Sequence, residues 1–445
     1  MKTVITYGTF DMLHYGHIRL LERAKALGDY LIVGITSDDY DKTRGKINVS
    51  QSLMERIEGV RATGLADKII VEEYPGQKID DVQRLGVDIF TVGSDWKGKF
   101  DYLNEYCKVV YLDRTQGISS SEIRAEKSKL RIGLVGDSTY LDKFYRECSF
   151  VNGAEIVGIC TNSLTKLSKE IQSLSCTTNV LEDLLNNVDA IFIISHPRNH
   201  YEQIKLALEK KKHVLCEAPS ALKVDDYNEL KELAEKNNCV FIDSVKTAFA
   251  TAYSRLLTLV KSGVIGDVIS VDATCTSLHS FDLEDKDEIE KTWSSILAWG
   301  PTALLPVFNI LGTDYISKNI IAKMLPEYPD FDIFTKIDFA YPSAVASIKV
   351  GKGIKSEGGL IISGTKGYVY VPAPWWKTDY FEVRYENPAN NRRYFYQLDG
   401  EGIRYEIVSF VKAVEMNRKL PQLSDLIEIA TIKILEDFYK KKNLI

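Results

Sequence analysis

The hydrophobic positions of this chain form short buried runs that alternate with longer stretches of helical periodicity. Val4 to Tyr7 is the first such run and predicts a buried strand. Apolar residues then recur at helical spacing from Ile18 to Leu27, which predicts a helix directly after it. The pattern continues with predicted strands at Leu130 to Val135, Glu155 to Cys160, Val188 to Ser195, His213 to Cys216 and Cys239 to Asp243. Strands that alternate with helices favour parallel sheets.

A short charged stretch divides this pattern in two. Residues 124–129 read Arg-Ala-Glu-Lys-Ser-Lys and directly precede the strand that begins at Leu130. A chain of 445 residues has room for two or three domains of roughly 100–200 residues each. We therefore expect a first α/β domain at residues 1–128 and a second part from residue 129 onward.

The composition of the chain argues against several classes of function. A net charge of -6 argues against a general binder of nucleic acid or of anionic membranes. The seven cysteines show no metal-ligand spacing, which is typical of reduced core thiols in a cytoplasmic protein. No apolar run approaches the roughly 18 residues that a membrane span needs, and we expect neither a membrane segment nor a protein metal site.

The turn between the first strand and the first helix carries the candidate chemistry. His14 and His17 lie three residues apart there, so both imidazoles share one face of the first helical turn. The helix N-terminus adds unpaired amides and a partial positive charge, and Gly8 and Gly16 allow a phosphate to approach the backbone. This combination predicts a nucleoside triphosphate site. Two solvated loop histidines are the alternative interpretation.

Two further segments carry residue types that bind phosphates and bases. Residues 93–101 read Gly-Ser-Asp-Trp-Lys-Gly-Lys-Phe-Asp, and residues 114–121 read Arg-Thr-Gln-Gly-Ile-Ser-Ser-Ser. Together with the histidine turn, they occur in the order and at the spacing of the cytidylyltransferase family. Residues 1–128 therefore resemble that family, and within it the glycerol-3-phosphate cytidylyltransferases.

This resemblance implies a Rossmann-like parallel sheet of the nucleotidyltransferase type and transfer of CMP from CTP to a small alcohol phosphate. The expected acceptor is glycerol 3-phosphate or a related polyol phosphate, and the products are a CDP-alcohol and pyrophosphate. Mg²⁺ is expected to enter with CTP. Such a product would serve bacterial surface polysaccharide biosynthesis.

The resemblance and the chemistry of the reaction together assign residues to this site. Nucleotidyl transfer is an in-line displacement, so the protein mainly positions reactants and neutralises charge. The expected catalytic residues are His14, His17, Lys46 and Arg114. The expected nucleotide-binding residues are Thr9, Phe10, Asp11, Gly16, Asp95, Trp96, Thr115, Ile118, Ser119, Ser120 and Ser121. The basic stretch 42–46 could also be a solvated loop, and the serines could simply cap a helix.

One position of the first part departs from the family pattern. Gly64 stands where family members commonly carry an arginine. Arg56 and Arg61, on a predicted helix, are the available substitutes, and the identity of the acceptor depends on them.

The second part resembles another family, the oxidoreductases related to glucose-fructose oxidoreductase and inositol dehydrogenase. Residues 194–200 (Ile-Ser-His-Pro-Arg-Asn-His), 212–219 (Lys-His-Val-Leu-Cys-Glu-Ala-Pro) and 263–268 (Gly-Val-Ile-Gly-Asp-Val) carry the resemblance, with a closing helical stretch from Tyr405 to Tyr439. It implies a Rossmann domain at residues 129–246 and an α+β open-sheet domain at residues 247–445. Such open sheets often build dimers, so we expect a homodimer or a higher homo-oligomer.

The second part also departs from its family at chemically important positions. Ala218 replaces the lysine of a glutamate-lysine-proline motif, and the dinucleotide turn keeps only the glycine at 136, followed by Asp137. No aspartate and histidine follow the helix start near Gly300. We therefore expect weak or absent hydride transfer.

NAD(P) remains a candidate cofactor, with NADP favoured because no acidic residue follows the second strand. The candidate dinucleotide-binding residues are Gly136, Ser138, Thr161, His196, Glu217 and Pro219. Two alternatives stay open for this part. It could reduce a keto or aldehyde phosphate with Lys246, Lys223 or His200 as the substitute donor, or it could be a non-catalytic dimerisation or ligand-binding module.

Overall fold

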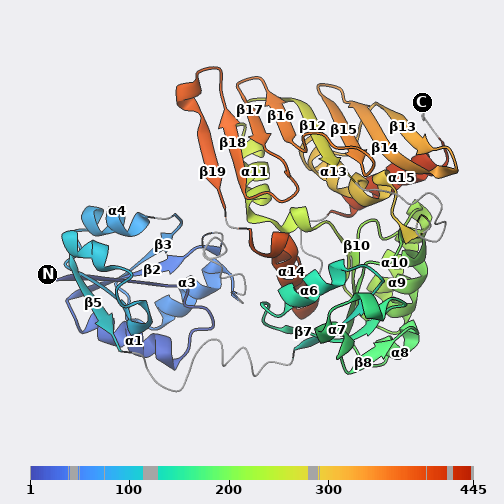
Figure 1. Ribbon diagram of the computed structural model, residues 1–445. Coiled ribbons are helices and arrows are strands. Elements are labelled where there is room, and N and C mark those ends of the chain that lie inside the picture. Colours follow the sequence, from blue (N-terminus) through green and yellow to red (C-terminus); the bar gives the residue numbers. More distant parts are fainter. Residues whose placement is uncertain are drawn as a thin grey trace. The chain divides into compact units, whose positions relative to one another are not determined.

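The computed structural model describes residues 2–38, 40, 49, 51–74, 76–113, 129–278, 289, 291–396, 398–417 and 424–441. The chain forms two compact units, Met1–Ser128 and Lys129–Ile445 (Figure 1). No helix within the described ranges is long and apolar enough to cross a membrane.

The first unit is built on a five-stranded parallel sheet in the order β3-β2-β1-β4-β5. Its strands are β1 (Thr3–Gly8), β2 (Tyr30–Thr36), β3 (Lys68–Glu72), β4 (Ile89–Gly93) and β5 (Lys108–Leu112). Its helices are α1 (Tyr15–Lys25), α3 (Leu53–Ala62), α4 (Gln77–Arg84) and the short 3-10 helices η1 (Ser94–Trp96) and η2 (Asp101–Glu105). Apolar residues of β1 are buried on both faces, Val4 in one core cluster and Ile5 in another, as expected for a covered parallel sheet.

The second unit begins with a six-stranded parallel sheet in the order β11-β10-β9-β6-β7-β8. Its strands are β6 (Leu130–Val135), β7 (Ala154–Cys160), β8 (Cys176–Thr178), β9 (Ala190–Ile193), β10 (His213–Glu217) and β11 (Phe241–Ser244). The elements between them are α6 (Tyr140–Cys148), η3 (Leu164–Lys166), α7 (Lys169–Gln172), α8 (Leu181–Leu185), η4 (Pro197–Asn199), α9 (His200–Glu209) and α10 (Val224–Lys236).

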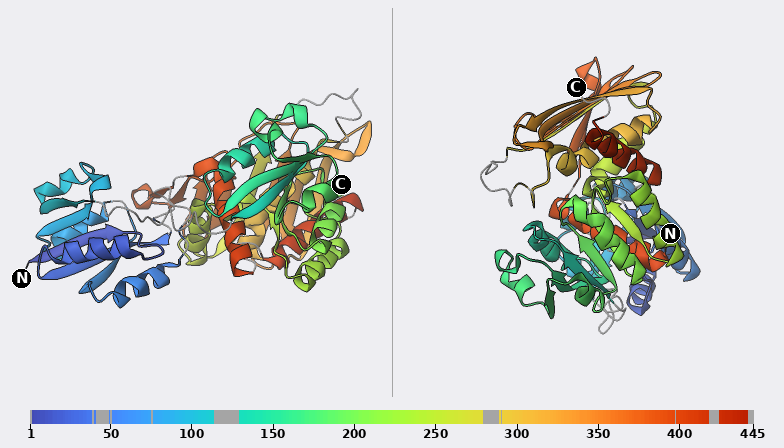
Figure 2. Two further views of the ribbon diagram at one scale, coloured as in Figure 1. Left: turned by 90° about the horizontal axis from the view of Figure 1, so that it is seen from below. Right: turned by 90° about the vertical axis from the view of Figure 1, so that its right-hand side faces the viewer.

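An eight-stranded mixed sheet completes the second unit, in the order β13-β14-β15-β12-β16-β17-β18-β19 (Figure 1). Figure 2 shows this sheet, coloured yellow to orange, from two further sides. Its strands are β12 (Val268–Thr276), β13 (Ser317–Leu325), β14 (Tyr328–Ala340), β15 (Val345–Gly351), β16 (Leu360–Gly364), β17 (Tyr368–Val371), β18 (Tyr380–Arg384) and β19 (Arg392–Phe395). The accompanying helices are η5 (Lys246–Phe249), α11 (Thr251–Lys261), α13 (Ser295–Leu311), η6 (Pro388–Asn390), η7 (Asp399–Gly402), α14 (Ile403–Met416) and α15 (Asp425–Tyr439).

The apolar helix α13 packs on the inner face of this sheet, and α15 packs against α13. Helix α14 returns to the six-stranded sheet and lies beside α6 (Figure 1). The predicted fold class is therefore confirmed: two parallel α/β sheets are followed by an α+β domain with an open sheet.

Candidate functional site

The histidine turn of the first unit has the predicted geometry. His14 is the N-cap of α1, and its Nδ1 accepts a hydrogen bond from the Gly16 backbone N–H at 3.1 Å. The His14 and His17 ring centroids lie 3.9 Å apart in a stacked arrangement. Because the lone pair of Nδ1 is used, a neutral His14 ring carries its proton on Nε2 and can donate it to a phosphate oxygen.

The loop before α1 is conformationally strained and tightly tied. Phe10 and Met12 have left-handed backbone angles, with φ of 52° and 50°. Such angles are unfavourable for residues with a Cβ and persist only where the surroundings fix them. Here the Asp11 carboxylate accepts from the Gln51 N–H at 2.9 Å, and the Met12 N–H donates to the Gln51 side chain at 2.7 Å. The loop is thus held rigid in front of the histidines.

Arg56 supports this loop from inside. Its side chain is fully buried, and one guanidinium nitrogen donates to the carbonyl oxygens of Thr9 and Thr36, each at 2.8 Å. Arg61 is exposed and pairs with Glu58 on the same helix. Arg56 therefore stabilises the loop backbone, and Arg61 pairs with a residue of its own helix. Neither contact is that of a substitute for the arginine that family members commonly carry near position 64.

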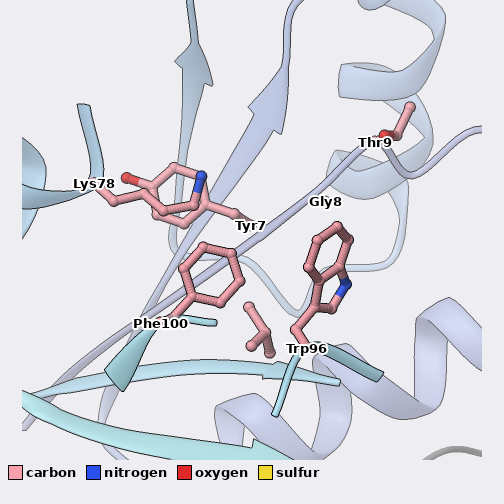
Figure 3. Close-up of a pocket in the computed structure, with 7 residues that line it drawn as sticks. Tyr7, Gly8, Thr9, Lys78, Trp96 and Phe100 are labelled. Carbon is pink, nitrogen blue, oxygen red and sulfur yellow. The ribbon is translucent and has the colours of Figure 1, made fainter. Parts of the chain in front are cut away.

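A small pocket lies beside this loop (Figure 3). Its volume is about 40 Å³, and it is lined by Tyr7, Gly8, Thr9, Lys78, Val92, Trp96 and Phe100. The end of β1 and Trp96 both line this pocket. The histidine turn and the segment 93–101, both indicated by the sequence analysis, therefore lie close together.

Lys78 is the residue of this pocket that the sequence analysis missed. It lies on α4, is only 7% exposed and forms an ion pair with the buried Glu72. Its Nζ is 4.6 Å from the centroid of the Tyr7 ring and 5.5 Å from that of Phe100. Lys78 lies four residues before the buried Val82 and therefore on the same face of the helix. This spacing could have indicated a buried lysine, which needs a charged partner.

The other predicted residues of the first unit fall into three groups. Thr9, Phe10, Asp11 and Gly16 lie in the histidine turn. Asp95 is exposed in η1, next to Trp96. Lys46, Arg114, Thr115, Ile118, Ser119, Ser120 and Ser121 lie outside the described residues.

Comparison with known proteins agrees with this geometry. Residues 5–126 match the model of the family described as cytidylyltransferase-like. The glycerol-3-phosphate cytidylyltransferase of Bacillus spizizenii is 49% identical over 130 residues, which are 29% of this chain and all of the relative. The enzyme of the same name from Staphylococcus aureus is 46% identical over 28% of this chain and 95% of its own length.

The chain belongs to the cytidylyltransferase-like family. As the sequence predicted, it is an enzyme of the CTP-dependent nucleotidyltransferase class. The cytidylyltransferase unit is joined to a second unit with its own relatives.

Residues 130–244 of that second unit match the model of an oxidoreductase family with an NAD-binding Rossmann fold. A solved 3-ketoreductase from Actinomadura kijaniata, in complex with NADP and TDP-benzene, superposes with a TM-score of 0.63 at 13% identity. The superposition covers 72% of this chain and 99% of the 3-ketoreductase, and it confirms the oxidoreductase fold.

The turn between β6 and α6 keeps one glycine of the dinucleotide pattern, and its backbone packs tightly against the segment that follows β9. Gly136 has a φ of 138°, and a Cβ there would lie 2.9 Å from the backbone of Ile194. The Ser138 hydroxyl accepts from the Tyr140 N–H at 3.2 Å at the start of α6. Leu141, at the place of the third glycine, is fully buried in the core. This turn therefore keeps the first glycine of the usual dinucleotide pattern and differs from it at the second and third glycine positions.

Asp137 is drawn to the end of the neighbouring strand β7. Its carboxylate accepts from the Thr161 hydroxyl at 2.8 Å and from the Asn162 N–H at 2.7 Å. The loop thereby places a carboxylate at the strand end where the sequence lacks the acidic residue of the family.

The remaining candidates of the second unit lie at the carboxyl ends of its strands. His196 caps η4 by accepting from the Arg198 N–H, and burial lowers its pKa to about 4. It also lines a pocket of about 180 Å³. Glu217 is the last residue of β10, and burial raises its pKa to about 7. The Pro219 carbonyl oxygen lies 2.8 Å from His200 Nδ1.

The three candidate substitute donors differ clearly. His200 is fully buried, with both ring nitrogens 2.8 Å from backbone carbonyl oxygens, so it braces the fold. Lys223 is exposed at the start of α10. Lys246 is mostly buried, and its Nζ lies 5.2 Å from the centroid of the Tyr140 ring. Of the three, only Lys246 has the surroundings of a site residue.

Proposed function

We propose that the first unit transfers CMP from CTP to glycerol 3-phosphate or a closely related polyol phosphate. The stacked pair of His14 and His17 at the N-terminus of α1 carries this proposal. The 49% identity to a glycerol-3-phosphate cytidylyltransferase supports the choice of acceptor.

The reaction is an attack of an acceptor phosphate oxygen on the α-phosphorus of CTP, with pyrophosphate leaving. The attacking phosphate is already ionised near neutral pH, so no strong general base is needed. The task of the protein is to stabilise the charge that develops on the α- and β-phosphate oxygens. His14 and His17 do this by donating hydrogen bonds, and the amides at the N-terminus of α1 add to the positive potential.

The remaining residues take supporting roles in this proposal. Lys78 and Trp96 line the pocket beside the histidine turn. In this proposal Lys78 serves the acceptor phosphate and Trp96 the nucleotide. Lys46, Arg114 and the serines at 119–121 bind the triphosphate. Mg²⁺ enters as part of the CTP substrate, held by phosphate oxygens and water.

Pyrophosphate release from CTP tests this function across a panel of acceptors. The panel contains the phosphates of glycerol, ribitol and erythritol, together with common sugar phosphates. We expect glycerol 3-phosphate to give the highest kcat/KM. A preference for a sugar phosphate would reject the acceptor, and absence of release with every member would reject the transfer itself.

A second candidate function concerns the second unit: reduction of a keto or aldehyde phosphate with NAD(P)H. Lys246 beside the buried Glu217 favours it, because this ammonium could deliver the proton to the carbonyl oxygen. The bound dinucleotide would supply the hydride. Binding of NADH and NADPH, followed by fluorescence, and their oxidation in the presence of dihydroxyacetone phosphate test this function. Dinucleotide binding without oxidation would favour a non-catalytic module.

We also propose a cytoplasmic homodimer formed through the outer face of the eight-stranded sheet. That face carries exposed aliphatic residues on three strands, namely Ile321 on β13, Val345 on β15 and Ile361 on β16. Apolar residues on an otherwise polar open sheet are typical of an association surface.

A further inference from the structure

Three lysines of the second unit converge on one carboxylate, that of Glu401 in η7. Lys377, from the loop between β17 and β18, places its Nζ 2.8 Å from Glu401 Oε1. Lys143 on α6 lies 3.6 Å from the same oxygen, and Lys246 in η5 lies 3.8 Å from Oε2. The cluster thus joins η7 to three other segments that are distant from one another in sequence.

The charges within this cluster do not balance. Three ammonium groups surround the Glu401 carboxylate. The adjoining Arg404 pairs with both Glu147 and Asp399, so four cations face three carboxylates and one positive charge is in excess. Glu406 lies nearby but does not compensate it, because complete burial and the neighbouring Glu217 raise its pKa well above the usual range. Burial opposes the ionisation of Glu401, but Lys377 and the other two lysines outweigh it and lower the pKa of that carboxyl.

The backbone that carries Glu401 is unusual. Gly400, Glu401 and Gly402 all have left-handed angles, with φ of 57°, 55° and 94°. The two glycines adopt this conformation easily, whereas Glu401 carries a Cβ that disfavours it. Its carboxylate is therefore held among the lysines by a turn that the residue itself does not favour.

Several buried polar atoms lie unsatisfied beside the lysines. Within the described part of the chain, the Tyr140 hydroxyl, Oε2 of Glu217 and both carboxyl oxygens of Glu406 have no hydrogen-bond partner. Tyr140 is linked to the cluster through Lys246, whose Nζ lies 5.2 Å from its ring centroid. Buried polar atoms are nearly always paired, so these atoms indicate hydrogen bonds to a molecule that enters the site.

The cluster also lies where open α/β sheets bind ligands. Tyr140 begins the helix after β6, Glu217 ends β10, and Lys246 follows β11. All three therefore lie at the carboxyl edge of the parallel sheet, outside which ligands of such sheets bind.

We propose that this cluster binds the phosphate monoester of a small polyhydroxy compound, and that the Glu401 carboxylate occupies the phosphate position until the ligand displaces it. A phosphate dianion matches three lysines better than a single carboxylate does. The hydroxyl or carbonyl groups of the ligand would pair with Tyr140, Glu217 and Glu406. The inference rests on the second candidate function for its ligand class and shares Lys246 and Glu217 with it, but the binding itself does not require hydride transfer.

Hydrogen exchange of the full chain, read by mass spectrometry, tests this proposal because it separates the two units. The probes are dihydroxyacetone phosphate, dihydroxyacetone and inorganic phosphate, each at up to roughly 10 mM. We expect dihydroxyacetone phosphate to slow exchange in residues 137–148 and 398–410, and dihydroxyacetone to have no effect. Protection by inorganic phosphate equal to that by dihydroxyacetone phosphate would overturn recognition of the polyhydroxy part.

Three variants test the roles of Glu401 and of the lysines in this binding. Glu401→Gln removes the internal competitor and should tighten dihydroxyacetone phosphate binding about tenfold, whereas Lys377→Gln should weaken it about tenfold. Lys261→Gln, which changes an exposed lysine at the end of α11, is the matched control and should change nothing. Weaker or unchanged binding by folded Glu401→Gln would overturn the displacement. A cluster that only stabilises the fold would show no protection in wild type, and Lys377→Gln would then lower the thermal midpoint alone.

Discussion

At the scale of single residues, the two stacked histidines make the sharpest prediction. His14→Ala or His17→Ala should lower kcat about 100-fold, because each removes a donor to charge that develops in the transition state. Affinity for CTP should change much less. Steady-state pyrophosphate release measures kcat, and CTP titration measures affinity. Tyr15→Ala changes an exposed residue between the two histidines and is the control. Wild-type turnover in either histidine variant would contradict the assignment.

Lys78 leads to a second prediction, which separates binding from stability. Lys78→Met should raise KM for the acceptor phosphate more than KM for CTP. It should also destabilise the first unit by about 3–5 kcal/mol, because Glu72 is left buried without its partner. Adding Glu72→Gln should recover much of the stability without restoring KM. Denaturant unfolding and acceptor kinetics on both variants test this, and full kinetic recovery in the double variant would reduce Lys78 to a structural role.

The histidine pair and Lys78 differ in how far their positions could be predicted from the sequence. The histidine pair was predictable because both residues lie in one turn, where spacing alone fixes which side chains share a face. Lys78 comes from another helix, about 60 positions after the histidines, and reaches the site only through the packing of α4 on the sheet. Arg56 was misjudged for the same reason, since nothing local to its helix indicates that it braces Thr9.

At the scale of elements, the parallel strands that the sequence indicated were placed to within a few residues, whereas β2 to β5 and β8 were not predicted. The run from Leu130 to Val135 coincides with β6, and the predicted strand from Val188 to Ser195 is shorter in the structure, as Ala190–Ile193. Short apolar runs between turns are a local signal, so their positions were accessible. The order of strands in the eight-stranded sheet could not be predicted from the sequence, because it depends on pairing between distant segments such as β12 and β15.

Helix α14 brings Glu406 against Glu217, and this packing predicts a pH dependence. Burial raises the pKa of Glu217 from 4.5 to about 7, and burial together with the neighbouring Glu217 raises that of Glu406 well above its ordinary value. The folded unit therefore holds protons that the unfolded chain releases, so its stability should fall as pH rises above about 4.5, by up to about 1.4 kcal/mol per pH unit for each group. Glu406→Gln should flatten this slope. Thermal or urea unfolding from pH 5 to 8 measures it, and equal slopes in variant and wild type would contradict the coupling.

At the scale of the whole molecule, the two compact units predict separable function. A fragment of residues 1–128 should fold and keep cytidylyltransferase activity, since the relative from Bacillus spizizenii is covered over its full length by 130 residues of this chain. Circular dichroism and pyrophosphate release on the purified fragment are the measurements. A soluble but inactive fragment would show that the second unit is required for the reaction.

The outer face of the eight-stranded sheet predicts how copies associate. Ile361→Lys places a charge at an exposed position of β16 and should dissociate the proposed dimer without unfolding the unit. Light scattering coupled to gel filtration measures the mass of wild type and variant. Lys236→Ala, which removes an exposed charge from α10 and not from this sheet, is the comparison and should leave the dimer intact. A monomeric wild type would exclude this association.

The strand order of both parallel sheets reverses beside their first strands, at β1 and at β6. Each unit therefore presents its first strand-to-helix turn at the crevice that open α/β sheets use for nucleotides. A single intact chain then offers two crevices of the kind that binds a diphosphate bridge in open α/β sheets. A titration with any one nucleotide should be analysed for two classes of sites, and one nucleotide in excess should act as an apparent inhibitor of the other. Crossed titrations, with CTP saturating while the dinucleotide is varied and the reverse, give the stoichiometry of each.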